Sequence, residues 1–169
     1  MLRRRMFGQL LLLTILLQAC TLSPTNIPQA LESQIDKNLT FSNVLQAPEA
    51  HIGKMIVLGG EILHSHREQE DMQLEILQLP LDEWQSPSRQ RTTSKGRFLA
   101  LMSEPPDPAT IPIHTRLTIV GEITGSTMAP LDESEYRFPT FKIHHHYIWD
   151  NAPYTSREQT QPRSSLFGR

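Results

Sequence analysis

The stretch Met55-Ile56-Val57-Leu58-Gly59-Gly60-Glu61-Ile62-Leu63 decides the fold of this chain. It predicts a β-strand over residues 54–64, because a run of aliphatic and β-branched side chains fits a buried strand. Paired glycines inside a strand usually mark a bulge or a tight bend at a barrel corner. We therefore expect Gly59 and Gly60 to bend the strand so that it belongs to both halves of a small barrel.

Four further stretches carry strand patterns bounded by glycine, proline or polar residues. They are residues 72–79, 97–102, 116–123 and 140–149, and residues 64–71 between the first two strands read as a polar hairpin loop. Five strands without a long helix favour an all-β fold, a closed five-stranded antiparallel barrel of the OB-like Greek-key type. A two-sheet β-sandwich is the alternative.

Two other glycines are expected at turns or bends of this barrel. Residues 48–53 predict one or two helical turns that begin at a proline and end at Gly53 in a left-handed conformation. Gly121 offers a second bend inside the strand over residues 116–123.

The last strand shows an alternating pattern. Its apolar and aromatic residues fall on one face at period two: Phe141, Ile143, His145, Tyr147 and Trp149. Lys142, His144 and His146 then fall on the opposite face, which reads as solvated.

The N-terminus has the pattern of an export signal. Three arginines, residues 3–5, precede an apolar run over residues 10–17, and Leu17-Gln18-Ala19-Cys20 resembles the lipobox of bacterial lipoproteins. The apolar run is about half of the roughly 20 residues that a membrane-spanning helix needs. The resemblance implies cleavage between Ala19 and Cys20, with S-diacylglycerol and an N-acyl chain on Cys20. This cysteine is the chain's single one, so no disulfide forms within one copy.

These features divide the chain into four parts. We expect a signal peptide over residues 1–19, a lipidated tether over 20–38, a β-barrel domain over 39–150 and a disordered polar tail over 151–169. Loss of residues 1–19 removes three arginines and no acidic residue, which takes the formal charge from −2 to −5. An acidic surface does not favour nucleic acid.

Histidines are the candidate metal ligands. His64 with His66, and His144 with His146, form two i, i+2 pairs that could supply imidazoles to zinc or copper if the fold brought them together. No cysteine or compact carboxylate cluster completes either pair, so two pairs of solvated histidines explain the pattern as well.

The sequence has no G-x-S-x-G, H-E-x-x-H or Walker-type motif, which argues against an enzyme. A basic loop with Arg89, Arg91, Lys95 and Arg97 could contact lipid phosphates or be a solvated loop.

An ordered set of short motifs extends along the chain after the lipobox. The set comprises Pro48 with Gly53-Lys54, Gly59-Gly60, Pro80-Leu81-Asp82, Ser94 with Gly96-Arg97-Phe98-Leu99, Val120-Gly121 with Gly125, and Tyr136-Arg137-Phe138-Pro139 ahead of Trp149. Together these motifs resemble the Slp family of outer-membrane lipoproteins, which has members associated with carbon starvation and stationary phase. The resemblance implies no catalytic residue and no cofactor apart from the covalent lipid.

The resemblance also implies a location. Thr21 follows the acylated cysteine where an aspartate would retain a lipoprotein in the inner membrane. We therefore expect a non-enzymatic lipoprotein on the periplasmic face of the outer membrane, with a binding or structural role in the envelope or in the response to stress and starvation. Its expected partners are outer-membrane lipid and the lipoprotein processing and sorting machinery. The alternative is a metal- or small-ligand-binding lipoprotein that uses the two histidine pairs.

Overall fold

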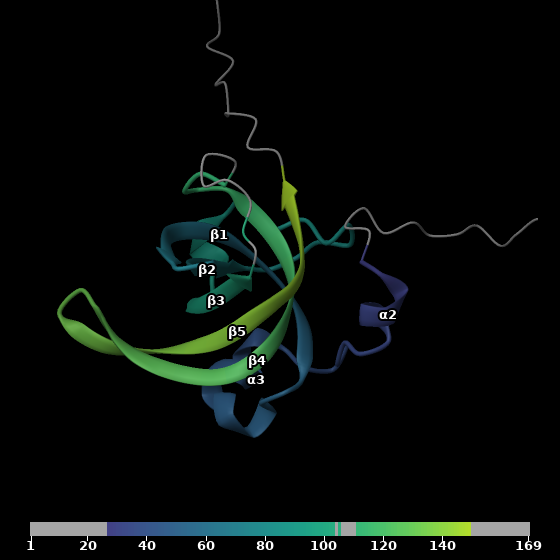
Figure 1. The fold of residues 1–169 in the computed structure, drawn as a ribbon, viewed down its shortest axis with the longest axis horizontal. Coiled ribbons are helices and arrows are strands. Elements are labelled where there is room, and N and C mark those ends of the chain that lie inside the picture. Colours follow the sequence, from purple (N-terminus) through teal and green to yellow (C-terminus); the bar gives the residue numbers. More distant parts are fainter. Residues whose placement is uncertain (1–26, 104, 106–110, 150–169) are drawn as a thin grey trace, which may run out of the picture.

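The computed structural model describes residues 27–103, 105 and 111–149, and these form a closed β-barrel (Figure 1). Three short helical elements precede it: α2 (Gln29–Glu32), α3 (Phe41–Gln46) and η2 (Pro48–His51). The strands are β1 (Met55–Glu68), β2 (Asp71–Leu79), β3 (Arg97–Ser103), β4 (Arg116–Leu131) and β5 (Ser134–Trp149), with η3 (Arg91–Thr93) before β3. Among these described elements, no helix is long and apolar enough to cross a membrane.

The strand order around the barrel is β1-β2-β3-β5-β4, and β4 closes onto β1. The predicted five-stranded barrel is therefore confirmed. One pairing differs from the fully antiparallel expectation: β3 and β5 run parallel at Leu99↔Thr140 and Leu101↔Lys142, so the sheet is mixed. The parallel pair follows from the long connection that carries the chain from β3 to β4 before β5 returns beside β3.

Strand β1 is shared by both halves of the barrel, as expected. Gly59, Gly60 and Glu61 pair with β2 on one side and with β4 on the other. Neither glycine has a positive φ, and the register shift falls between Ile62 and His64 instead. Both glycines lie within the strand rather than at a turn.

Close approach of β2 explains Gly60. A Cβ there would lie 2.3 Å from Cγ2 of Ile76 and 2.6 Å from the carbonyl oxygen of Leu77. At Gly59 the nearest atom is a side-chain carbon of Leu81, at 2.2 Å. The two residues are thus glycines because neighbouring atoms leave no room for a side chain.

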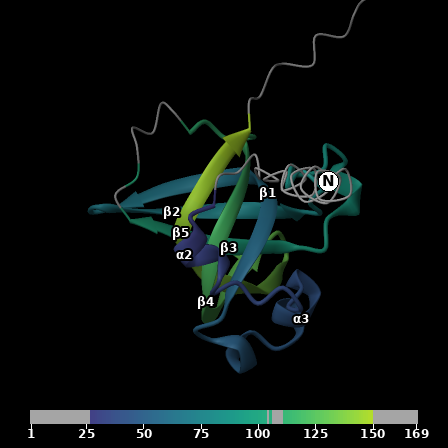
Figure 2. The same cartoon turned by 90° about the vertical axis from the view of Figure 1, so that its right-hand side faces the viewer.

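The barrel interior is filled by side chains that alternate along the strands. Phe98 contacts Phe41 on α3 and Phe141 on β5, at ring-centroid distances of 5.7 and 5.2 Å. Helix α3 lies at one end of the barrel (Figure 2) and begins with a capping box in which Asn43 N–H donates to Thr40 Oγ1. The core residues are Phe41, Val44, Ile56, Leu58, Ile62, Met72, Leu74, Ile76, Phe98, Ala100, Met102, Ile111, Leu117, Ile119, Ile123, Phe141 and Ile143.

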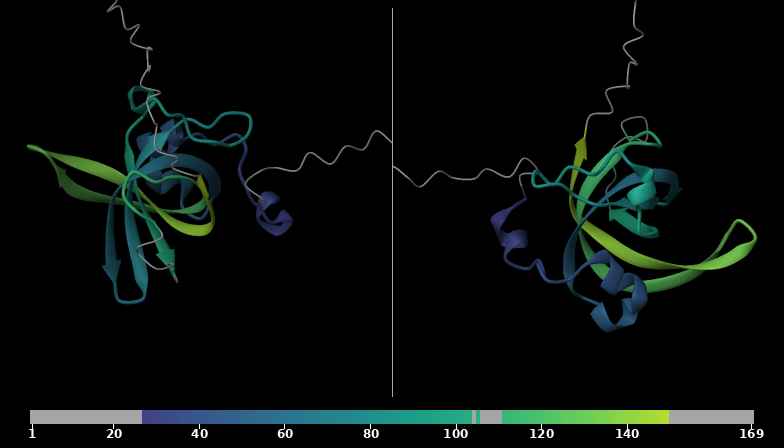
Figure 3. Two further views of the ribbon diagram at one scale, coloured as in Figure 1. Left: turned by 90° about the horizontal axis from the view of Figure 1, so that it is seen from above. Right: turned by 180° about the vertical axis from the view of Figure 1, so that it is seen from behind.

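Strands β1, β4 and β5 are longer than the hydrophobic patterns predicted. Strand β1 continues to Glu68, so His64 and His66 lie in a strand rather than in a hairpin loop. Strands β4 and β5 extend as a hairpin that projects from the barrel (Figure 3), and the chain turns at Asp132 and Glu133. Cross-strand pairing continues through these extensions, from Ser65↔Leu74 to Glu68↔Asp71 and from Ser126↔Pro139 to Leu131↔Ser134, where the sequence has no aliphatic run.

The expected single face of β5 is wrong, because a bulge interrupts its alternation. Val120 pairs with His145 and Gly121 pairs with Ile143, which leaves His144 as the extra residue. A bulge reverses which face the following residues occupy. Phe141 and Ile143 therefore face the core, whereas Tyr147 and Trp149 lie on the outer face, opposite Thr118 and Arg116.

Two segments cover the outer face of β1 and β4. The N-terminal segment adds a parallel bridge between Ile35 and Met55, and Asp36 Oδ2 pairs with Lys54 Nζ at 3.1 Å. Part of the expected tether over residues 20–38 thus contacts the barrel. The loop over residues 80–95 lies beside it, where Gln85 O accepts a hydrogen bond from Thr118 Oγ1 at 2.6 Å.

Candidate functional site

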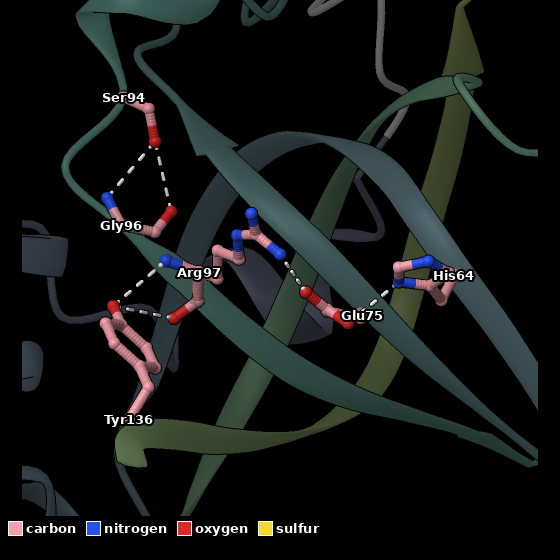
Figure 4. Close-up of polar contacts among 6 residues, drawn as sticks. All are labelled: His64, Glu75, Ser94, Gly96, Arg97 and Tyr136. Atoms are coloured by element: carbon pink, nitrogen blue, oxygen red, sulfur yellow. Dashed lines mark hydrogen bonds and ion pairs between the residues drawn. The ribbon is translucent and has the colours of Figure 1, made fainter. Parts of the chain in front are cut away.

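A row of polar side chains crosses the outer face of β1, β2 and β3: His64, Glu75 and Arg97 (Figure 4). On β2, one carboxylate oxygen of Glu75 accepts a hydrogen bond from Arg97 Nη1 at 2.7 Å, and the other is hydrogen-bonded to His64 Nδ1 at 2.9 Å. The Glu75 side chain is 18% exposed. Burial acts to raise its pKa, but the hydrogen bonds from Arg97 and His64 outweigh burial, and the pKa is lowered overall. Glu75 is therefore ionised at neutral pH and acts as a fixed negative charge rather than a proton carrier.

Tyr136 fixes the start of β3 beside this row. Its hydroxyl accepts a hydrogen bond from Arg97 N–H at 3.1 Å (Figure 4). The preceding residue, Gly96, has a φ of 140°, and a Cβ there would lie 2.5 Å from the Tyr136 hydroxyl. Ser94 Oγ accepts from Gly96 N–H at 3.1 Å. No sequence pattern predicts a role for Tyr136, and the structure places its hydroxyl against Gly96 and Arg97.

Half-exposed leucines lie beside this row of polar side chains. Alternation along β2 and β3 places every second residue on this outer surface. We name this surface the open face; it consists of Gln73, Glu75, Leu77, Arg97, Leu99 and Leu101. In contrast, Met55 and Thr118 on the other half of the barrel wall are buried beneath the N-terminal segment and the 80–95 loop.

The two histidine pairs are not brought together. His144 Nε2 contacts Glu122 Oε2 at 2.8 Å, and Glu122 pairs with Met55 at the start of β1. His64 lies nine residues further along β1, a strand length of about 30 Å. Among the described residues, no three His, Cys, Asp or Glu side chains are placed to hold a metal ion.

His144 and His146 do not share a face either, which corrects the expected solvated pair. The bulge leaves His146 opposite Ile119, which is buried, and His146 itself is half-buried. Burial, and secondarily the charge of His145, lowers its pKa. His146 is therefore a neutral side chain at the barrel wall.

The basic loop is divided between separate ion pairs. Arg91 binds Glu61 through two nitrogens, Nη2 at 2.7 Å and Nε at 3.1 Å, and His114 Nδ1 lies 2.9 Å from the same carboxylate. Arg97 binds Glu75, while Arg89 and Lys95 are exposed. The four cations therefore do not form one continuous patch.

The predicted lipidation residues, Ala19 and Cys20, and the predicted tail over residues 151–169 lie outside the described residues. Of the predicted turn glycines, Gly53 follows η2 with a φ of 81°, and Gly121 adjoins the bulge opposite β5.

Comparison with known proteins identifies one family. A family model described as the outer membrane lipoprotein Slp family matches residues 17–168. The search of curated proteins returned no match. Among solved structures, the chain is similar to "OBody AM3L09 bound to hen egg-white lysozyme", with 11% sequence identity and a TM-score of 0.41. That alignment covers 65% of this chain and 92% of the other.

Proposed function

Because the chain belongs to the Slp family of outer membrane lipoproteins, we propose that acyl chains on Cys20 anchor it to the periplasmic face of the outer membrane. The barrel then acts as a non-enzymatic binding module at that surface. The observation that carries this proposal is the extent of the family match, which begins at residue 17, inside the lipobox, and continues through the whole barrel.

Energetics support a permanent anchor. A single acyl chain gives only reversible membrane binding, and each buried methylene contributes about 0.8 kcal/mol. Three chains on one cysteine would contribute on the order of 30 kcal/mol. Thr21, in place of aspartate, supports sorting to the outer membrane.

Replacement of the acylated residue tests the anchor. Cells that express wild type, Cys20→Ala or the neighbouring control Ser23→Ala are labelled with a clickable fatty acid and fractionated. Wild type and Ser23→Ala should carry label and sediment with the outer membrane, whereas Cys20→Ala should lose both properties. Equal label on all three proteins would overturn the lipid anchor.

The open face is the proposed binding surface, and a protein is its proposed partner. Leu77, Leu99 and Leu101 remain half-exposed there beside the fixed charges of Glu75 and Arg97, whereas the opposite part of the wall is covered by the chain itself. A non-obligate interface is about as apolar as the rest of a protein surface, and Arg is enriched in it, so half-exposed leucines beside Arg97 are compatible with such an interface.

Site-specific crosslinking tests this surface in intact cells. A photo-crosslinking amino acid is placed at Leu101 on the open face, and at Met128 on the projecting hairpin as an exposed control. Discrete adducts with protein should form from Leu101 and not from Met128. Adducts from Met128 alone would refute the open face as the binding surface.

A further inference from the structure

Both tryptophans of the chain lie in one outer region of the barrel. Trp84 is at the tip of the 80–95 loop, and 61% of its surface is exposed. Asp82 Oδ1 accepts hydrogen bonds from the backbone N–H groups of Trp84, at 2.9 Å, and Ser86, at 2.8 Å. The tip is therefore held in one conformation, with an exposed indole at its end.

Hydrogen bonds connect this tip to the end of β5. Trp149 Nε1 donates to Thr118 Oγ1 at 3.0 Å, and the same hydroxyl donates to the carbonyl oxygen of Gln85 at 2.6 Å. Tyr147 contacts Trp149 edge to face, with ring centroids 4.9 Å apart. The residue after Trp84 is thus linked through Thr118 to Trp149. We name the outer region that holds Trp84, Tyr147 and Trp149 the aromatic patch.

Two arginines border the aromatic patch. Arg116 pairs with Trp149 across β4 and β5, and its Nη1 donates to Pro87 O at 2.8 Å. Arg89, two residues after Pro87, is exposed. Burial, and secondarily the charge of Arg89, lowers the pKa of Arg116, while Glu61 acts to raise it. Glu83 and Asp82 are the acidic residues of the tip, and Asp82 is engaged with the backbone. The patch therefore combines indoles with guanidinium groups.

The described chain begins beside this patch. Ile27 and Gln85 line the same cavity, of about 400 Å³, and Figure 3 shows the 80–95 loop and the N-terminal segment on the same side of the barrel. Seven residue steps separate Cys20 from Ile27, and even a fully extended chain spans only about 25 Å over that number. An anchor at Cys20 would therefore hold this side of the barrel close to the lipid.

We propose that the aromatic patch lies against the phospholipid surface of the membrane and orients the barrel on it. This inference rests on the proposed lipid anchor. Trp and Tyr favour the membrane interface because their rings are apolar and their N–H or O–H groups are polar. Arg116 and Arg89 supply donors for lipid phosphates. The open face and the projecting hairpin then remain available to the periplasm.

Intrinsic fluorescence tests the orientation, because the chain's two tryptophans both lie in the patch. The mature lipidated protein, which begins at the acylated Cys20, is reconstituted in vesicles of phosphatidylethanolamine and phosphatidylglycerol that contain a lipid brominated near the glycerol backbone. We expect the emission to be quenched, and Trp84→Phe to remove most of the quenching. The matched control is Met128→Trp in a chain with both native tryptophans changed to Phe. Met128 is 55% exposed and lies ten residues along β4 from Thr118. The brominated lipid should therefore not quench the emission of a tryptophan at this position.

The outcomes separate the two proposals. Mass spectrometry and vesicle flotation report acylation of Cys20 and membrane attachment. If the protein is acylated and floats with the vesicles but Trp84 emission is not quenched, the proposed orientation is wrong and the anchor stands. The same follows if a tryptophan at position 128 is quenched as strongly as Trp84. A protein without acylation overturns the anchor and the orientation together. Quenching that appears only when lipopolysaccharide is present assigns the patch to that lipid and overturns the phospholipid assignment.

Discussion

Replacement of Gly60 by alanine should destabilise the barrel more than replacement of its neighbour. The new Cβ would lie 2.6 Å from the Leu77 carbonyl oxygen, a backbone atom that cannot rotate away. It would also lie 2.3 Å from Cγ2 of Ile76, whose side chain is fully buried. To reach an ordinary contact of 3.4 Å, β1 and β2 must separate by about 0.8 Å at this point.

The expected cost follows from the measured range for overpacked cores. Overpacking destabilises proteins by about 1–3 kcal/mol, occasionally more, and we expect about 3 kcal/mol because a backbone atom is involved. For a domain of this size such a loss lowers the Tm by roughly 10 °C or more. Urea and thermal unfolding of the mature chain without its lipid, followed by tryptophan fluorescence, measure the change.

Gly59→Ala is the matched control for this prediction. Its nearest contact is the end of the half-exposed Leu81 side chain, which can move, and the nearest backbone atom, Leu79 O, is 3.0 Å away. We expect a loss of about 1 kcal/mol. If Gly60→Ala lies within about 0.5 kcal/mol of wild type, or if Gly59→Ala is equally destabilising, the close-approach argument is wrong.

Four further predictions concern sorting, stability and pH. Thr21→Asp should move the protein toward the inner-membrane fraction, and an unchanged density-gradient profile would contradict this. Tyr136→Phe leaves the Arg97 N–H without its acceptor and should cost about 1–2 kcal/mol in urea unfolding; no loss would contradict the contact. The lowered pKa of Glu75 means that its carboxylate contributes stability above its ordinary value of 4.5, and that this contribution is lost as pH falls through the folded-state pKa. Glu75→Gln should therefore destabilise the protein at pH 7, and by progressively less as the pH is lowered below 4.5. Because the pKa of His146 is lowered in the folded state, the unfolded chain binds a proton more tightly, and the free energy of unfolding should fall as pH drops below 6.5. His146→Gln should make the Tm less dependent on pH in this range, as thermal melts at several pH values would show.

Local sequence patterns determined the number of strands and favoured a closed barrel over a β-sandwich, and the structure confirms the barrel. The aliphatic run around Gly59 and Gly60 is long enough to pair with two neighbours, and the structure pairs it with both β2 and β4. Proline and glycine at residues 48 and 53 predicted the helical turn before β1. Such signals are readable because backbone geometry and hydrophobic burial act over a few neighbouring residues.

The bulges were decided by tertiary structure. The period-two pattern from Phe141 to Trp149 predicted one face, but the extra residue at His144 moves Tyr147 and Trp149 to the outer face. Nothing in the alternation itself marks the interruption, because the residues on both sides of it are apolar or aromatic. Pairing with β4, which curves to close the barrel, determines where the extra residue lies.

The side-chain clusters were also decided by tertiary structure. Glu75 with Arg97, and Glu61 with Arg91, are pairs separated by 22 and 30 residues that meet only because strand register and the 80–95 loop place them together. The sequence alone determined which residues could carry charge, lipid or an aromatic ring. Register along β1 and closure by β4 determined which of them are neighbours, because a shift of one residue moves every side chain to the opposite face.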